Sequence, residues 1–220
     1  MEREPPVEAN VRIPADSVKL DGIMGLPRGA QGIVAFAHGS GSSRLSPRNG
    51  HVARVLQATG LGTLLFDLLT EREAAHRVNV FDVMFLAQRL RAATAWIRQQ
   101  EATTGLRIAY FGASTGAAAA LIAAAADPSV RAIVSRGGRP DLATAALPNV
   151  KVPTLLIVGG LDRAVIRMNE QAYKQLRCEK QMCIVAGATH LFEEPGTLDE
   201  VTSLATAWFR RHLCDRGGDA

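Results

Sequence analysis

The sequence predicts an α/β fold with a mostly parallel, eight-stranded sheet and helices on both faces. Short apolar runs alternate with helical segments over most of the chain, the pattern of a parallel sheet that is covered on both sides. The chain opens instead with two mixed runs that resemble a hairpin. Its 220 residues suffice for one sizeable core, and no repeat or linker interrupts the pattern. We therefore expect a single domain over residues 1–220.

The eight predicted strands fall into two groups. The first two form the antiparallel start, and six parallel strands follow. The predicted strands cover residues 7–13, 18–26, 32–37, 62–66, 107–111, 130–135, 154–158 and 181–186. Sheets of this kind bind ligands at the carboxyl ends of their strands, so functional residues are expected directly after the strands.

Five helices are predicted between the strands, over residues 47–59, 80–100, 115–126, 163–176 and 197–213. Pro47 suits a first helical turn. The apolar residues of 80–100 recur with a period of 3.6 residues. The Ala-rich helix 115–126 ends before Asp127-Pro128.

Composition disfavours several partners. The net charge is +4, but the basic residues are scattered and only 5% of the chain is aromatic, which is unlike a nucleic-acid-binding surface. The stretch 117–126 is too short to span a bilayer, and residues 1–6 do not resemble a signal peptide. Three cysteines without a C-x-x-C pair favour a reducing compartment. We therefore expect a cytoplasmic protein that binds neither nucleic acid nor a membrane.

A candidate nucleophile follows the strand 107–111. Here the chain reads Gly112-Ala113-Ser114-Thr115-Gly116 and enters the Ala-rich helix. This G-x-S-x-G pattern between a strand and a helix is the nucleophile elbow of α/β-hydrolases. Ser114 would lie at the tip of a strained turn, with glycines preventing a collision between strand and helix. The alternative is an ordinary strand–helix turn.

A serine hydroxyl needs a neighbouring base and an acid to orient that base. Of the five histidines, His190 lies in the loop directly after the last strand, where this fold carries its base, whereas His212 falls within a predicted helix. Asp162 follows the strand before it and is the predicted acid. Asp67 also ends a strand, but it precedes Ser114, whereas the chain order of this fold is Ser, acid, His. The other interpretation of Asp67 is a helix cap or an ion pair.

Two backbone N–H groups are expected to stabilise the oxyanion, one from Thr115 and one from the loop His38-Gly39-Ser40-Gly41. Ser40 is the predicted donor in this loop, with an uncertainty of one residue. His38 is interpreted as a structural residue that hydrogen-bonds within the loop. No companion ligands stand at metal-binding spacing, so no metal and no cofactor are expected.

Together these residues resemble the dienelactone hydrolase family, in particular its serine-containing members. The resemblance rests on segments 38–49, 66–70, 112–116 and 135–141 and on His190. It implies an α/β-hydrolase fold and an enzyme that cleaves esters. The founding members use cysteine as nucleophile, so Ser114 favours ordinary carboxylic esters over dienelactone itself. Some proteins of this subgroup are fused to, or labelled as, phosphoribosyltransferases, but nothing here resembles a phosphoribosyl-pyrophosphate loop.

The connection after the sixth strand limits the substrate. Only residues 137–151 separate this strand from the next, which leaves no space for a lid domain. A shallow, open cleft and a small ester substrate are therefore expected. Arg136 and Arg44 are candidate ligands for a substrate carboxylate. Alternatively, the arginines of this edge pair with Asp141, Asp67 or Glu71 and hold the loops.

The sequence thus predicts a carboxylesterase that works through an acyl-enzyme on Ser114. Two alternatives remain open. The same residues would serve an acyltransferase or a perhydrolase, and the fold also occurs in binding proteins without catalytic activity.

Overall fold

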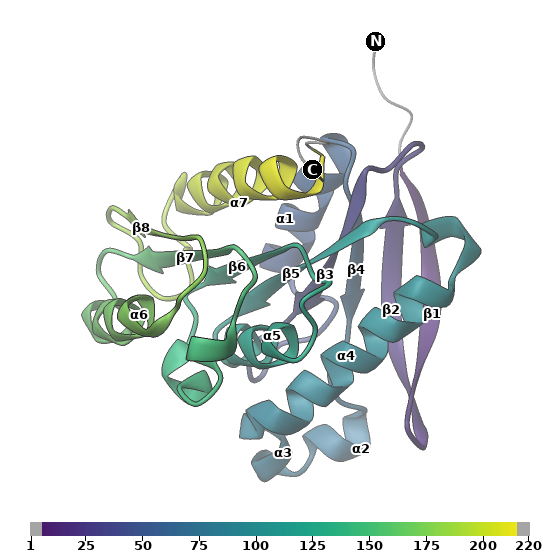
Figure 1. Ribbon diagram of the computed structural model, residues 1–220, viewed down its shortest axis with the longest axis horizontal. Helices are drawn as coiled ribbons and strands as arrows, with labels where there is room; N and C mark the ends of the chain where they lie inside the picture. Colours follow the sequence, from purple (N-terminus) through teal and green to yellow (C-terminus); the bar gives the residue numbers. More distant parts are fainter. Residues whose placement is uncertain (1–5, 215–220) are drawn as a thin grey trace.

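The central sheet has eight strands, the number that the sequence predicted, and their order is β1-β2-β4-β3-β5-β6-β7-β8 (Figure 1). The computed structural model describes residues 6–214, so the predicted extension of the domain into residues 1–5 and 215–220 lies outside the described residues. β1 pairs with β2, and β2 with β4, in antiparallel fashion, and all later pairs are parallel. The strands are β1 Val7–Ala15, β2 Val18–Leu26, β3 Gly32–Ala37, β4 Gly62–Phe66, β5 Arg107–Ala113, β6 Ala132–Arg136, β7 Thr154–Gly159 and β8 Lys180–Val185.

Helices cover both faces of the sheet and divide the core in two. α1 (Pro47–Ala58) and α7 (Thr197–Leu213) lie on one face, and α4 (Val83–Gln99), α5 (Thr115–Ala125) and α6 (Arg163–Gln175) lie on the other (Figure 1). On the first face Phe36, Phe111 and Phe209 are buried. On the second face the small side chains of α5 pack around Tyr110 and Leu90. Because β3 to β7 are covered on both sides, their residues are almost all apolar and buried.

The predicted helix over residues 80–100 is wrong at its start. The chain forms two short helices first, α2 (Glu71–Ala74) and α3 (Arg77–Phe81), and α4 begins only at Val83. Asp82 breaks the helix with φ −77° and ψ 86°, and its carboxylate accepts a hydrogen bond from the Phe85 N–H at 3.0 Å. Asp is a preferred residue at a helix N-cap. The apolar period runs across this break, so periodicity alone did not reveal it.

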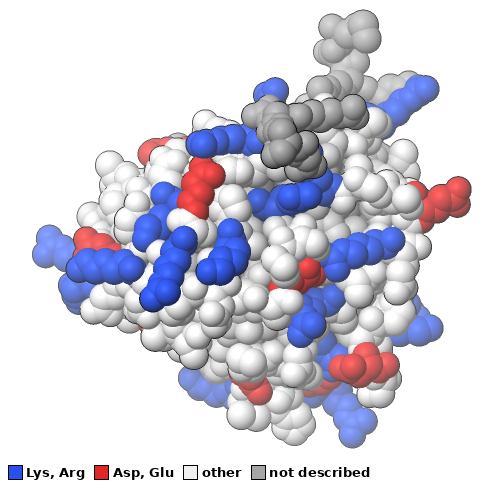
Figure 2. Space-filling view, in the orientation of Figure 1, with Lys and Arg blue, Asp and Glu red and all other residues white. Residues whose placement is uncertain are grey.

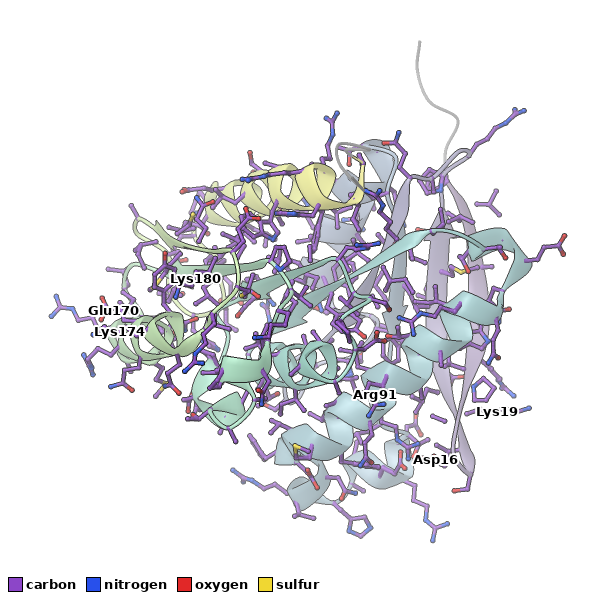
Figure 3. All side chains as sticks on the ribbon, viewed as in Figure 1. Asp16, Lys19, Arg91, Glu170, Lys174 and Lys180 are labelled. Carbon is purple, nitrogen blue, oxygen red and sulfur yellow. The ribbon has the colours of Figure 1, made fainter. Side chains whose placement is uncertain are left out.

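A buried arginine fastens these extra helices to the hairpin. Arg89 of α4 donates to the carbonyl of Ala15 at 2.7 Å and to Glu73 of α2 at 2.6 Å, and it pairs with Asp16 at 3.3 Å. Figure 3 shows Asp16 and Lys19 at the β1–β2 turn, beside α2 and α4. One guanidinium therefore holds α2 and the hairpin in place.

The connection from β6 to β7 is short, as predicted. It contains two single-turn 3-10 helices, Pro140–Ala143 and Leu147–Asn149, and it carries no lid domain. Within residues 6–214, no helix combines the length and the apolar character needed to cross a bilayer. On the face seen in Figure 2, Lys and Arg side chains are spread over several elements with Asp and Glu between them.

The start of α5 approaches the end of β3 very closely. A side chain at Gly116 would place its Cβ 2.1 Å from the carbonyl oxygen of Ala37 and 2.5 Å from that of His38. Both are backbone atoms, which have little freedom to retreat. Gly116 therefore sets the distance between the β5–α5 turn and the loop after β3.

We predict that Gly116→Ala lowers the free energy of unfolding by about 2 kcal/mol or more, because overpacking against backbone forces the helix away from the sheet. Gly50→Ala in α1 is the matched control. Its Cβ would meet only the Arg54 side chain, at 3.5 Å, and alanine favours a helix by about 1 kcal/mol over glycine. Urea unfolding of both variants tests this, and a Gly116→Ala variant as stable as the wild type would contradict it.

Candidate active site

Ser114 lies in a strained turn between β5 and α5. Its backbone has φ 50° and ψ −120°, an unfavourable region for a residue with a side chain. Two hydrogen bonds hold it there: the Ser114 N–H donates to the Arg136 carbonyl at 3.3 Å, and the Arg139 N–H donates to the Ser114 carbonyl at 3.1 Å. The turn predicted from the G-x-S-x-G pattern is present, with Ser114 at its tip.

The structure brings Asp162 and His190 together. His190 Nδ1 and Asp162 Oδ2 are 2.7 Å apart, which is a charge-assisted hydrogen-bond distance. The other carboxylate oxygen of Asp162 accepts from the Val165 N–H at 3.3 Å and so caps α6. Since the helix also positions the carboxylate, Asp162 has little freedom to leave the imidazole.

The loops that carry these two residues are joined by backbone contacts. The Leu161 N–H donates to the Ala188 carbonyl at 2.9 Å, and the Gly160 N–H donates to the Val185 carbonyl at 2.8 Å. A Cβ on Gly159 would lie 2.5 Å from the Ala188 carbonyl oxygen, so the end of β7 has no room for a side chain. The acid and base loops therefore behave as one unit.

The His190 ring lies at the end of β6, next to the Ser114 turn. A Cβ on Gly137 would be 3.6 Å from His190 Cε1. The residue before Gly137 is Arg136, which pairs in the sheet with Ala113, the residue before Ser114. All three predicted catalytic residues are thus at the carboxyl edge of the sheet, on adjoining loops.

Asp67, the rival acid, is engaged elsewhere. Its carboxylate accepts the Arg44 backbone N–H at 2.7 Å and forms an ion pair with the Arg44 guanidinium. The ion-pair interpretation of Asp67 is therefore confirmed, although the partner belongs to the loop after β3. Arg139 pairs with Asp141 at 2.8 Å in the same way, so Arg44 and Arg139 both hold loops. Among the other histidines, His51 pairs with Asp199 at 2.9 Å.

The two residues predicted to stabilise the oxyanion are bonded to each other. The Ser40 N–H donates to the hydroxyl oxygen of Thr115 at 3.0 Å. Thr115 is the first residue of α5, and N–H groups in a first turn have no acceptor within the helix. The Thr115 N–H is thus available to a ligand, whereas the Ser40 N–H already has an acceptor. This contact joins residues 75 positions apart, and no sequence motif signalled it.

His38 fastens the loop after β3 to the loop after β4. Its Nδ1 lies 2.9 Å from the Gly39 carbonyl oxygen, and its Nε2 accepts the Leu68 N–H at 3.1 Å. These partners require a neutral ring with the proton on Nδ1. Burial lowers the pKa of His38, against smaller opposing effects of the Gly39 hydrogen bond and the Asp67 charge. The structural interpretation of His38 is confirmed.

A cavity of about 730 Å³ opens beside this loop. Gly39 and Ser40 form part of its wall, and a Cβ on Gly39 would lie 3.0 Å from Ser114 Cβ. The sequence did not predict this cavity, to which α2 and α3 contribute further walls. Apolar side chains and charged groups share the lining: Leu45, Leu68, Leu69, Val80 and Leu86, with Lys19, Asp21, Arg44, Asp67, Glu71 and Arg72. Figure 3 shows the position of Lys19.

Arg136 differs from the position predicted for it. It is the last residue of β6 instead of a loop residue, and it is only 7% exposed.

Among the described residues, no group of three or more His, Cys, Asp or Glu side chains could hold a metal ion.

Comparisons with known proteins agree with this architecture. The sequence model of a family described as PETase, PET hydrolase-like, matches residues 84–217. The crystal structure of dienelactone hydrolase from Anabaena variabilis is 55% identical, covers 96% of this chain and 100% of its own, and has a TM-score of 0.93. Est1E from Butyrivibrio proteoclasticus has a TM-score of 0.80 over 94% of this chain and 99% of its own, at 15% identity, and so shares the fold.

Two curated Mycobacterium tuberculosis proteins, from strains CDC 1551 and H37Rv, are 54% identical to 97% of this chain. They carry provisional names as phosphoribosyl transferases. The match covers 49% of each, so this chain spans about half the length of the curated relatives it matches.

The sheet order, the strained serine turn and the loops around it define an α/β-hydrolase. Within that superfamily, the chain belongs to the dienelactone hydrolase family, as its sequence motifs and the full-length match to the Anabaena variabilis structure agree. The resemblance stated from the sequence is therefore confirmed.

The lowered pKa of His38 predicts a pH-dependent contribution to stability. The unfolded chain binds a proton near pH 6.5, the ordinary value, but the folded ring resists protonation. The stability that the neutral His38 ring contributes to the folded state is therefore present above about pH 6.5, and it is lost as the pH falls through the folded pKa.

We expect His38→Leu to be less stable than the wild type by about 1–3 kcal/mol at pH 8, because the Leu68 N–H and the Gly39 carbonyl lose their partner. The difference in the free energy of unfolding between the two proteins should narrow toward pH 5, since only the wild type carries the titrating ring. Urea unfolding at a series of pH values measures it. A gap that stays constant or widens on acidification would show that the folded ring accepts a proton.

Proposed function

We propose that this protein is a carboxylesterase-like serine hydrolase that cleaves small carboxylic esters through an acyl-enzyme. Ser114 is the nucleophile, His190 the base and Asp162 the acid that orients the base. The observation that carries the proposal is the 2.7 Å hydrogen bond between His190 and Asp162 beside the strained Ser114 turn. The membership in a hydrolase family supports it.

The mechanism follows from the chemistry of these groups. The Ser114 hydroxyl attacks the ester carbonyl while His190 Nε2 takes its proton. Asp162 keeps the other ring proton on Nδ1 and stabilises the imidazolium. The tetrahedral intermediate collapses, and His190 returns the proton to the leaving alcohol. Water then attacks the acyl-enzyme with His190 again as base, which releases the acid and restores Ser114.

The oxyanion accepts hydrogen bonds from the Thr115 N–H at the start of α5 and from the Ser40 N–H. The Ser40 N–H now donates to Thr115 Oγ1, so it must share its proton between the hydroxyl and the oxyanion, or leave the hydroxyl when substrate binds. If the Ser40 N–H leaves the hydroxyl, the loop after β3 loses this contact with α5.

The 730 Å³ cavity beside Gly39 and Ser40 is the proposed seat of one substrate group. Pockets of this size bury a ligand of drug-like dimensions. Its apolar leucines and valine suit a short hydrocarbon or aromatic group, and the charged residues at its wall suit polar substituents. This supports a compact ester as the small-molecule partner.

The acyl-enzyme also permits transfer to an acceptor other than water, so an acyltransferase or perhydrolase is the second candidate. Product analysis with hydrogen peroxide or an alcohol added separates these. We further propose that any phosphoribosyl transfer by the longer M. tuberculosis relatives belongs to their unmatched half, because the matched half has the α/β-hydrolase fold. The free thiols of Cys178 and Cys183 support a reducing, cytoplasmic location.

We expect Ser114→Ala to abolish labelling by a fluorophosphonate probe and to reduce p-nitrophenyl acetate turnover by about 10⁴-fold or more. Ser203→Ala, at an exposed position of α7, is the control and should retain both. Gel fluorescence and the release of p-nitrophenol measure the two effects. A wild-type protein that neither takes the label nor hydrolyses the ester would refute the proposal and favour a binding protein.

A further inference from the structure

Within residues 6–214, the buried positive charge of Arg136 has no acidic partner. The residue is 7% exposed, and its Nε has no hydrogen-bond acceptor among the described residues. Its Nη2 reaches Asn49 Oδ1 only at 3.5 Å, and its guanidinium lies 5.9 Å from the centre of the Phe192 ring. Buried charges in proteins are normally paired, because an isolated ion loses its hydration without compensation.

The alternation of β6 shows where this charge points. Ala132 and Val134 lie in the core under α1 and α7, so Arg136 projects toward the same face. Asn49, which it approaches, is a buried residue in the first turn of α1. The guanidinium therefore lies at the N-terminal end of α1, where the helix dipole is itself positive.

A second arginine increases the local positive charge. Arg48, also in the first turn of α1, has a buried Nε without an acceptor among the described residues. Its Nη1 pairs with Glu193 at 2.8 Å, but that carboxylate is 61% exposed. Burial and, as a smaller effect, the charge of Arg48 together lower the pKa of Arg136 to about 10. Two arginines and a helix N-terminus thus converge, while Glu193, the acidic partner of Arg48, is largely in solvent.

We propose that Arg136, Arg48 and the first turn of α1 form a binding site for a small anion, of the size of chloride or formate. The anion would accept hydrogen bonds from the two unpaired Nε–H groups, which are charge-assisted and strong. Asn49 and Phe192, the two neighbours of the Arg136 guanidinium, are almost fully buried, so we expect the site to admit only a small anion.

The position of this site links it to the loop of His190. Phe192 packs near Arg136, and Glu193 pairs with Arg48, and these residues follow His190 by two and three positions. An anion between the arginines would remove their mutual repulsion and so stabilise the contact of this loop with α1 and β6. The inference rests on this geometry alone and holds whether or not the protein is an esterase.

Thermal unfolding of the whole protein at constant ionic strength tests the proposal, with sodium gluconate replaced stepwise by sodium chloride, formate or pivalate. Gluconate and pivalate are larger than the anions that we propose for the site. Chloride and formate should raise the unfolding midpoint in a saturable way, as a ligand of the folded state does, and pivalate should not. An equal rise with all three anions, or no rise, would overturn the site.

Variants locate the effect. Arg136→Met should lose the saturable rise of the unfolding midpoint. Arg48→Met should weaken the apparent affinity for the anion about tenfold, because one charge-assisted hydrogen bond is lost. Arg12→Met changes an exposed arginine of β1 and should keep the wild-type response. If Arg136→Met does not fold, a bromide-soaked wild-type crystal gives the answer. An anomalous peak between the two guanidinium groups supports the site, and a peak elsewhere or none there contradicts it.

Discussion

The hydrogen bond between His190 Nδ1 and Asp162 Oδ2, 2.7 Å long, is the constraint on which the candidate active site depends. It requires two loops that follow neighbouring parallel strands to meet, and the backbone is arranged to allow this. Gly159 lets the end of β7 touch the Ala188 carbonyl, and the Leu161 N–H donates to that same carbonyl. α6 fixes the carboxylate from the other side through the Val165 N–H. The imidazole is thus held in one tautomer before any substrate binds.

The remaining loops of this edge are connected to their neighbours by single polar contacts. The Thr115 hydroxyl joins α5 to the loop after β3, and His38 and Arg44 join that loop to the residues after β4. Glu193 connects the His190 loop to α1. Because each loop depends on the next, a change at one contact is expected to reach the serine turn through the backbone. Arg136, whose Nε is unpaired among the described residues, lies close to the contact between the His190 loop and α1. An anion bound there would strengthen that contact.

The sequence predicted the strands well because buried parallel strands are continuous apolar runs, and it predicted Ser114 because a nucleophile elbow needs glycines at fixed positions. Asp162 and Asp67 both follow strands, so chain order alone separated them, and the Arg44–Asp67 pair that engages Asp67 joins loops distant in sequence. Arg136 was predicted in a loop. The strand runs one residue further than expected, and since side chains alternate in a strand, this residue turns into the core face. The break at Asp82 was missed because a cap within an apolar period leaves the period intact.

The kcat/KM of Asp162→Asn and Asp67→Asn for p-nitrophenyl acetate tests the central claim most directly. An amide at Asp162 would still cap α6 but would hold the wrong tautomer of His190, so kcat/KM should fall by about 10⁴-fold with little loss of folding stability. Asp67→Asn should lose less than about tenfold, since it weakens a loop contact with Arg44 and leaves the imidazole in place. A larger loss for Asp67→Asn than for Asp162→Asn would contradict the assignment of the acid.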